Sequence, residues 1–209
     1  MTVISHPSPR AFLGRAAPLL YLAEAENNLL LGLAETASRE TTAPPHRRWF
    51  LTVEQEDRVV GASLLAEPFC NAIITRLPTT AITELIDSLS RESVPVLGVI
   101  GPDPYSAEFA SLWSRTQQVP ATLKFNQRIY QCTAVNPVPF VPGALREGLP
   151  AELELLLAWN RAFDTEIGFD VPPAHSEDLI RKAVAARTLC VWDHDGPVSI
   201  AGASRETAN

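Results

Sequence analysis

The chain has 209 residues, of which 24 are Asp or Glu and 17 are Lys or Arg, so its net charge at pH 7 is −7. Its composition, 46% hydrophobic and 20% charged, is that of a globular protein. An acidic chain without a run of Lys or Arg lacks the basic surface that binds nucleic acids and anionic membranes. We therefore expect neither of them as a partner.

The N-terminal residues Met1–Pro7 lack the basic and then apolar pattern of a signal peptide. The longest apolar stretches, residues 16–23 and 29–34, are too short to span a bilayer. These observations predict a soluble, cytoplasmic protein.

The cysteines Cys70, Cys132 and Cys190 are widely spaced, odd in number, and lie in apolar or strand-like contexts. This pattern favours reduced core cysteines over a disulfide framework. Neither the cysteines nor the scattered histidines have the spacing of zinc ligands, so we expect no metal.

Hydrophobic periodicity predicts two helices at the start of the chain, over residues 9–23 and 26–38. A β-hairpin is predicted next, because two runs rich in β-branched and aromatic residues, 49–54 and 58–65, flank the acidic turn 55–57.

Alternating strands and helices are predicted after this hairpin. A third strand covers residues 71–77 and is followed by a helix with an apolar face over 79–91. A short strand at 96–100 precedes a helix over about 103–118. The next segment, 123–135, is extended and has residues typical of a strand.

A proline at every second or third position makes residues 136–143 a semi-rigid linker. We place the domain boundary there, between an N-terminal domain, 1–135, and a C-terminal part, 144–209.

The C-terminal part is predicted to begin with a strand at 144–147 and a helix at 149–163. Ser176 can cap a second helix, with acidic residues in its first turn. A hairpin of strands 189–192 and 197–204 follows.

Both parts therefore place two helices before a hairpin, which indicates an internal repeat. Each hairpin has an acidic turn, and its returning strand carries Gly-Ala-Ser, at residues 61–63 and 202–204. The predicted fold class is α/β, with mixed sheets.

On residues 26–33, 59–63 and above all 191–205, the sequence resembles the GNAT superfamily of acetyl-CoA-dependent N-acetyltransferases, in particular bacterial members with two tandem GNAT-like halves. The resemblance implies the acyl-CoA N-acyltransferase fold, with a complete but degenerate N-terminal half and a partial C-terminal half. It also implies acetyl-CoA as co-substrate and transfer of its acetyl group to an amine of a small molecule or peptide. In that chemistry a base removes the ammonium proton while backbone donors polarise the carbonyl.

The family holds the CoA pyrophosphate on a glycine-rich loop between the fourth strand and the next helix, where backbone N–H groups are free to donate. Residues 75–81 occupy this place in the first half; they include no glycine, and Pro78 has no N–H. We expect the corresponding loop of the second half beyond Asn209, so that the chain is truncated before its CoA-binding motif.

The alternative is a non-catalytic GNAT remnant that binds a ligand or a partner without the pyrophosphate loop. In either case the partial C-terminal sheet has an open edge, and we expect a homodimer partner or a complementing chain to cover it.

The resemblance places the acceptor-amine pocket beside the loop after the first C-terminal helix. Phe163, Phe169 and Trp192 are candidates to line it, and Glu166 is a carboxylate that could orient the amine or act as general base. Core packing of the aromatic residues and a solvated acidic loop are the alternatives. No pattern identifies the catalytic base or the residues that bind CoA.

Overall fold

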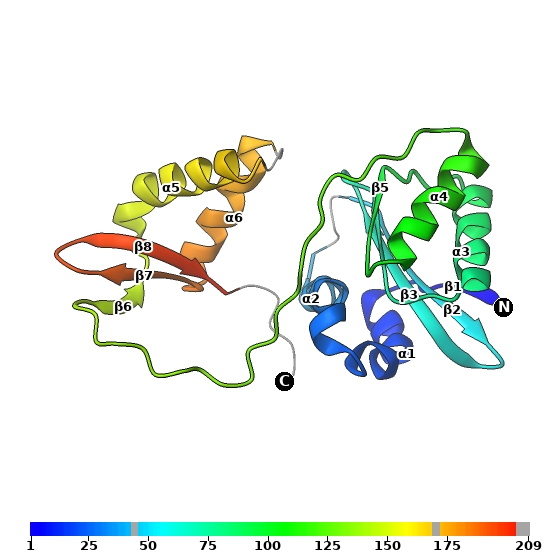
Figure 1. Cartoon of the computed structure of the whole chain (residues 1–209), viewed down its shortest axis with the longest axis horizontal. Helices are drawn as coiled ribbons and strands as arrows, with labels where there is room; N and C mark the ends of the chain where they lie inside the picture. Colours follow the sequence, from blue (N-terminus) through cyan, green and yellow to red (C-terminus); the bar gives the residue numbers. More distant parts are fainter. Residues whose placement is uncertain (43–45, 169–171, 204–209) are drawn as a thin grey trace. The chain divides into compact units, whose positions relative to one another are not determined.

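The computed structural model of the chain describes residues 1–42, 46–168 and 172–203. It is a mixed α/β protein that divides into two compact units, unit 1 from Met1 to Thr133 and unit 2 beginning at Ala134 (Figure 1). Each unit has its own sheet and its own hydrophobic core. Among the described helices, none is both long and apolar enough to cross a membrane.

Unit 1 is built on a sheet with the strand order β1-β2-β3-β4-β5. The first four strands pair antiparallel, and β5 pairs parallel with β4. The strands are β1 (Thr2–Ser5), β2 (Arg48–Gln55), β3 (Arg58–Ala66), β4 (Asn71–Ile74) and β5 (Gly98–Ile100). Strand β1 was not predicted, because this edge strand buries little of its surface and shows no period of two.

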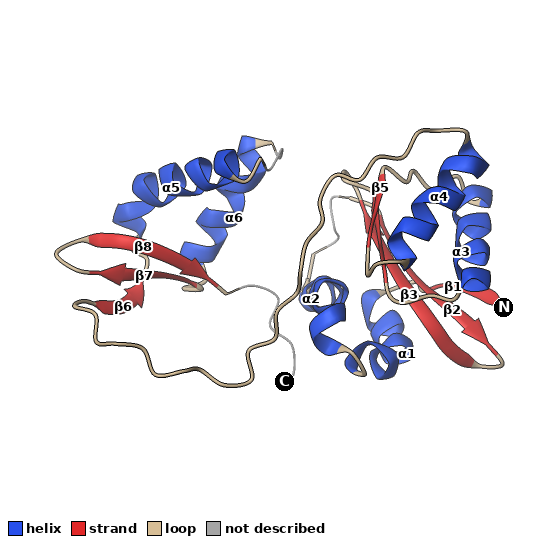
Figure 2. Ribbon diagram, viewed as in Figure 1, coloured by secondary structure: helices blue, strands red, loops and turns tan. Residues whose placement is uncertain are grey.

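Helices cover both faces of this sheet (Figure 2). They are α1 (Pro9–Tyr21), α2 (Glu24–Arg39), α3 (Thr79–Arg91) and α4 (Tyr105–Gln117), close to the predicted bounds. Ser8 caps α1, since its Oγ accepts a hydrogen bond from the N–H of Ala11. The side chains of β2 alternate between the two layers: Phe50 packs with α1 and α2, whereas Leu51 and Val53 pack with α3 and α4.

Unit 2 has an antiparallel sheet with the strand order β6-β7-β8. Its elements are β6 (Ala144–Glu147), η1 (Pro150–Glu152), α5 (Leu153–Glu166), α6 (Pro173–Ala185), β7 (Leu189–Asp193) and β8 (Pro197–Gly202). Both helices pack on the same face of the sheet, where they enclose a small core (Figure 2). The buried residues of this core are Leu156, Leu157, Ile180, Val184, Leu189 and Val191.

The two units share an element order and a local irregularity. The order β1-α1-α2-β2-β3 of unit 1 returns as β6-α5-α6-β7-β8, and in each hairpin the register shifts at one place. The extra residue on the returning strand is Val60 in unit 1 and Val198 in unit 2. The bulge therefore provides a structural alignment of the two hairpins.

This alignment overturns the match between the Gly-Ala-Ser triplets. Gly61 directly follows the extra Val60, whereas Gly202 lies four residues after Val198. The residue that corresponds to Gly61 is Ser199, which pairs with Trp192 as Gly61 pairs with Val53. The strands are equivalent, but the triplets are not.

Four further predictions are wrong. Residues 123–135 form no strand and are exposed, because no neighbouring strand pairs with them. Helix α5 continues to Glu166, which was placed in a loop. Helix α6 begins at Pro173, whose ring fixes a helical φ, so Ser176 lies inside the helix instead of capping it. Cys132 is exposed and is not a core residue.

Candidate functional site

The β4–α3 connection, residues 75–78, is where the resemblance to acetyltransferases puts the phosphate loop. Thr75 is buried and is tied to β3: its N–H donates to the carbonyl of Ala62 at 3.1 Å, and its Oγ1 accepts from the N–H of Ala62 at 3.0 Å. Pro78 occupies the N-cap of α3, where its carbonyl accepts from the N–H of Ala81. The connection is thus short and fixed by its neighbours.

Side chains fill the space beside this connection. Leu77 is 1% exposed and lies so close to Gly61 that an added Cβ there would come within 1.8 Å of a Leu77 methyl carbon. Arg76 donates hydrogen bonds from Nε to both carboxylate oxygens of Glu26 on α2, at 2.8 and 3.0 Å. A buried leucine and an ion pair are not a phosphate cradle, so the residues present do not fit the pyrophosphate of CoA.

The residues predicted to line the acceptor pocket are not all brought together. Phe163 lies on α5 with 57% of its surface exposed, and Glu166 is the exposed last residue of the same helix. Trp192 lies on the opposite face of the sheet, because its neighbour Val191 points into the core beneath α5 and α6. Phe169 falls outside the described residues. Only Phe163 and Glu166 thus share one end of a helix, and their role stays a prediction.

A polar cluster beside Phe163 joins α5 to α6. The Oγ of Ser176, a buried residue of α6, donates to Asp164 Oδ2 at 2.5 Å. The side-chain amide of Asn160 donates to the same oxygen at 2.9 Å and to Ser176 Oγ at 2.7 Å. The Asp164 carboxylate is therefore engaged in helix packing. The four-residue spacing of Asn160 and Asp164 is the sequence signal for this cluster, but the partner on α6 becomes evident only in the fold.

Each hairpin holds an acidic residue on its first strand, directly after the place where the register shifts. Arg15 of α1 donates two hydrogen bonds to the buried Glu54 in unit 1, and Arg146 of β6 binds Asp193 in unit 2. The arginine lowers the pKa of each carboxyl group below its ordinary value. Arg146 also binds Glu152, and these hydrogen bonds lower the pKa of Glu152 to about 2. Carboxylates committed to arginine in this way are weak general bases, so these clusters serve to hold the elements together.

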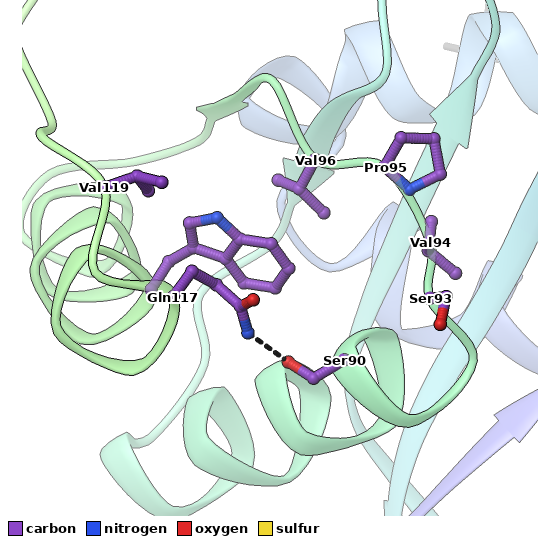
Figure 3. A pocket seen from close by; sticks show the side chains of 8 residues that line it. Ser90, Ser93, Val94, Pro95, Val96, Gln117 and Val119 are labelled. Atoms are coloured by element: carbon purple, nitrogen blue, oxygen red, sulfur yellow. Dashed lines mark hydrogen bonds between the residues drawn. The ribbon is translucent and has the colours of Figure 1, made fainter.

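A pocket of about 390 Å³ opens at the C-terminal ends of α3 and α4 in unit 1 (Figure 3). Gln117 donates a hydrogen bond to Ser90 Oγ across it at 2.8 Å, and Trp113 stacks on Phe109 with 6.0 Å between ring centroids. Its lining contains no charged side chain: Ser90, Ser93, Val94, Pro95, Val96, Trp113, Gln117 and Val119. The pocket offers hydroxyl, amide and indole contacts but no acid, base or activated nucleophile, and no sequence motif marked it.

Within the part of the chain that the structure describes, no group of three or more His, Cys, Asp or Glu side chains could hold a metal ion. Comparison with protein-family models, with curated proteins and with solved structures found no match to this chain. The function must therefore be argued from the topology and from these contacts.

Proposed function

We propose that this chain is part of an acetyltransferase of the GNAT superfamily, which in its complete form transfers an acetyl group from acetyl-CoA to an amine. The observation that carries the proposal is the course of unit 1. An antiparallel run of strands ends at β4, β4 leads directly into α3, and β5 returns parallel to β4. The resemblance requires such a junction of fourth strand and helix, and the repeated strand–helix order of unit 2 supports it.

Unit 1 has no role in holding CoA under this proposal, because Leu77 and the Arg76–Glu26 pair fill its β4–α3 connection. We assign the co-substrate to unit 2, on an element equivalent to β4 and α3 that is not among the described residues. The acceptor is an amine of a small molecule or peptide, with Phe163 and Glu166 as the candidates to contact it, and the protein acts in the cytoplasm.

The alternative is a protein that binds a ligand or partner without catalysis. The filled connection of unit 1 favours it, because a catalytic GNAT half cannot dispense with the backbone donors that hold the pyrophosphate.

The test compares the protein isolated from the cells that make it with the 209-residue chain. We expect the cellular protein to bind one equivalent of acetyl-CoA in a calorimetric titration, with a Kd on the order of micromolar. The 209-residue chain should give only heats of dilution, because side chains fill the β4–α3 connection of its unit 1. A cellular protein that does not bind acetyl-CoA would decide for the alternative.

A control variant distinguishes a phosphate site in unit 2 from one in unit 1. Arg76→Ala in the cellular protein should leave the Kd for acetyl-CoA within about twofold, since Arg76 is committed to Glu26 in unit 1. A loss of binding in this variant would place the phosphate site in unit 1 instead.

A further inference from the structure

One face of the unit 2 sheet carries apolar side chains that neither α5 nor α6 covers, and only the segment before β6 reaches it among the described residues of unit 2, where the Trp192 indole donates to the carbonyl of Pro142 at 3.1 Å. Helices α5 and α6 pack on the other face, where Val191 is fully buried (Figure 2). Residues that alternate with Val191 point away from the helices, together with their partners on the neighbouring strands. Four of them are apolar: Cys190 and Trp192 on β7, Leu145 opposite Trp192 on β6, and Ala201 opposite Cys190 on β8. Two are polar, Glu147 opposite Cys190 and Ser199 opposite Trp192. Leu145 is 62% exposed. We call the four apolar residues the outer face.

The repeat in unit 1 shows what covers an equivalent face. With the two bulges aligned, Cys190 corresponds to Leu51 and Trp192 to Val53. Leu51 is 2% exposed and Val53 is 0% exposed, because both lie in the core that α3 and α4 complete. The outer face thus corresponds to a face that is buried under helices in unit 1.

The edge of the unit 2 sheet leads to the same conclusion. In unit 1, β3 pairs with β4 through Ser63 and Ile74. Ala201 of β8 corresponds to Ser63, since these two residues pair with Cys190 and Leu51 respectively. Among the described strands, β8 pairs only with β7, so one row of its backbone N–H and C=O groups is left without a strand partner.

We propose that the outer face and the β8 edge form a docking surface for a strand–helix element of the kind that β4 and α3 provide in unit 1. The strand runs antiparallel to β8 and places an apolar residue opposite Ala201, as Ile74 lies opposite Ser63. The helix that follows lays an apolar stripe on Cys190 and Trp192. The apolar stripe of α3 shows which kind of side chains the docking helix carries: Ala81, Ile82, Leu85, Ile86 and Leu89.

The occupant is a polypeptide segment that is not among these 209 residues. Helix α3 is committed to the core of unit 1. This argument uses the repeat alone and does not depend on the acetyltransferase assignment.

The cysteines provide the first test, in the purified 209-residue chain as a monomer. If the outer face is open, iodoacetamide should alkylate Cys190 within about tenfold of the rate at the exposed Cys132, whereas the buried Cys70 should react more than about a hundredfold more slowly. Protection of Cys190 equal to that of Cys70 would mean that residues of this chain already cover the face, and the proposal would be overturned.

The second test identifies the occupant in the cells that make the protein. A photoreactive benzoylphenylalanine replaces Ala201 on the outer face or, as the matched control, the exposed Ala158 of α5. We expect the probe at 201, and not the one at 158, to cross-link to a segment outside the 209 residues that combines a short strand with apolar residues at helical spacing. A synthetic copy of that segment should slow alkylation of Cys190 at least about tenfold.

Three results would contradict the proposal: a cross-link from position 201 to unit 1 of the same chain, a cross-link to a second copy of this chain, or no cross-link beyond that of the control. Because none of these readouts uses acetyl-CoA, a failure of the docking surface can be told apart from a failure of the acetyltransferase proposal.

Discussion

A methyl group added at Gly61 tests whether Leu77 fills the β4–α3 connection. The new Cβ would lie 1.8 Å from Cδ2 and 2.9 Å from Cγ of Leu77, too close for carbon atoms that are not bonded. Leu77 must move, although it is packed in the core with 1% of its surface exposed. Overpacking of this kind costs about 1–3 kcal/mol, so we expect Gly61→Ala to reduce the free energy of unfolding of unit 1 by about 2 kcal/mol.

A double-mutant cycle makes this prediction specific to the contact. Leu77→Ala alone should cost about 2–5 kcal/mol, because it leaves a cavity. The Gly61 methyl fills part of that cavity, so the double variant should lose at least about 1 kcal/mol less than the sum of the single variants. Gly14→Ala in α1 is the control: no heavy atom lies within 4 Å of its added Cβ, so this variant of unit 1 should not lose stability and can gain up to about 1 kcal/mol.

The assay is urea unfolding followed by tryptophan fluorescence, with Trp49 and Trp113 reporting unit 1 after Trp159 and Trp192 are replaced by Phe. The free energy of unfolding comes from the midpoint and slope of each transition. Additive losses would mean that Leu77 does not pack on Gly61. The β4–α3 connection would then have more free space beside it than the structure shows, and a phosphate site in unit 1 would have to be reconsidered.

Two further predictions concern the polar clusters of unit 2. The pKa of Glu152 is lowered from 4.5 to about 2 by Arg146, so the ionised group stabilises the fold above its unfolded pKa, and this contribution disappears as the pH falls toward 2. We expect the urea midpoint of unit 2 to drop over this range, and Arg146→Met to flatten the drop; an unchanged pH profile in the variant would refute the assignment. Ser176→Ala should cost about 1–3 kcal/mol, because it leaves the Asp164 carboxylate with one donor fewer. Thr165→Ala removes an exposed hydroxyl that donates to the carbonyl of Arg161 within α5 and should cost less than about 0.5 kcal/mol, so equal losses would count against the cluster.

Elements with a strong apolar period were predictable from the sequence, and the structure confirms them. The helix predicted over residues 79–91 is α3 with the same bounds, because its apolar side chains recur at helical spacing and all face one core. Strand β1 and the segment 123–135, in contrast, were not predictable from their local sequence pattern. The first is a strand through its pairing with β2, and the second has strand-like residues but no strand to pair with. Pairing between distant segments decides both, and no local pattern reports it.

The candidate site was less predictable than the fold. The absence of glycine in residues 75–81 is a local property that the sequence displays directly. That Leu77 and the Arg76–Glu26 pair fill the space beside this connection depends on the packing of distant segments, and only the structure shows it. The acceptor-pocket prediction combined residues from a helix and a strand, and the structure places Trp192 on the far side of the sheet from Phe163. Trp192 takes the face opposite to its neighbour Val191, and which of these two faces α5 and α6 cover is decided only by the tertiary packing.

The bulge also determines where these hairpins tolerate changes in length. Deleting Val60 would leave Val53 opposite Gly61 and Glu54 opposite Val59, so both neighbouring pairs would keep their partners and faces. Deleting Val198 would preserve the pairs on either side in the same way. A deletion at Ala62 would instead force every later residue of β3 to the opposite face, exchanging its two buried sets. We therefore expect related sequences to lose or gain residues at the bulge or in the turn of each hairpin. They should hardly ever do so among the paired residues that follow the bulge on the returning strand.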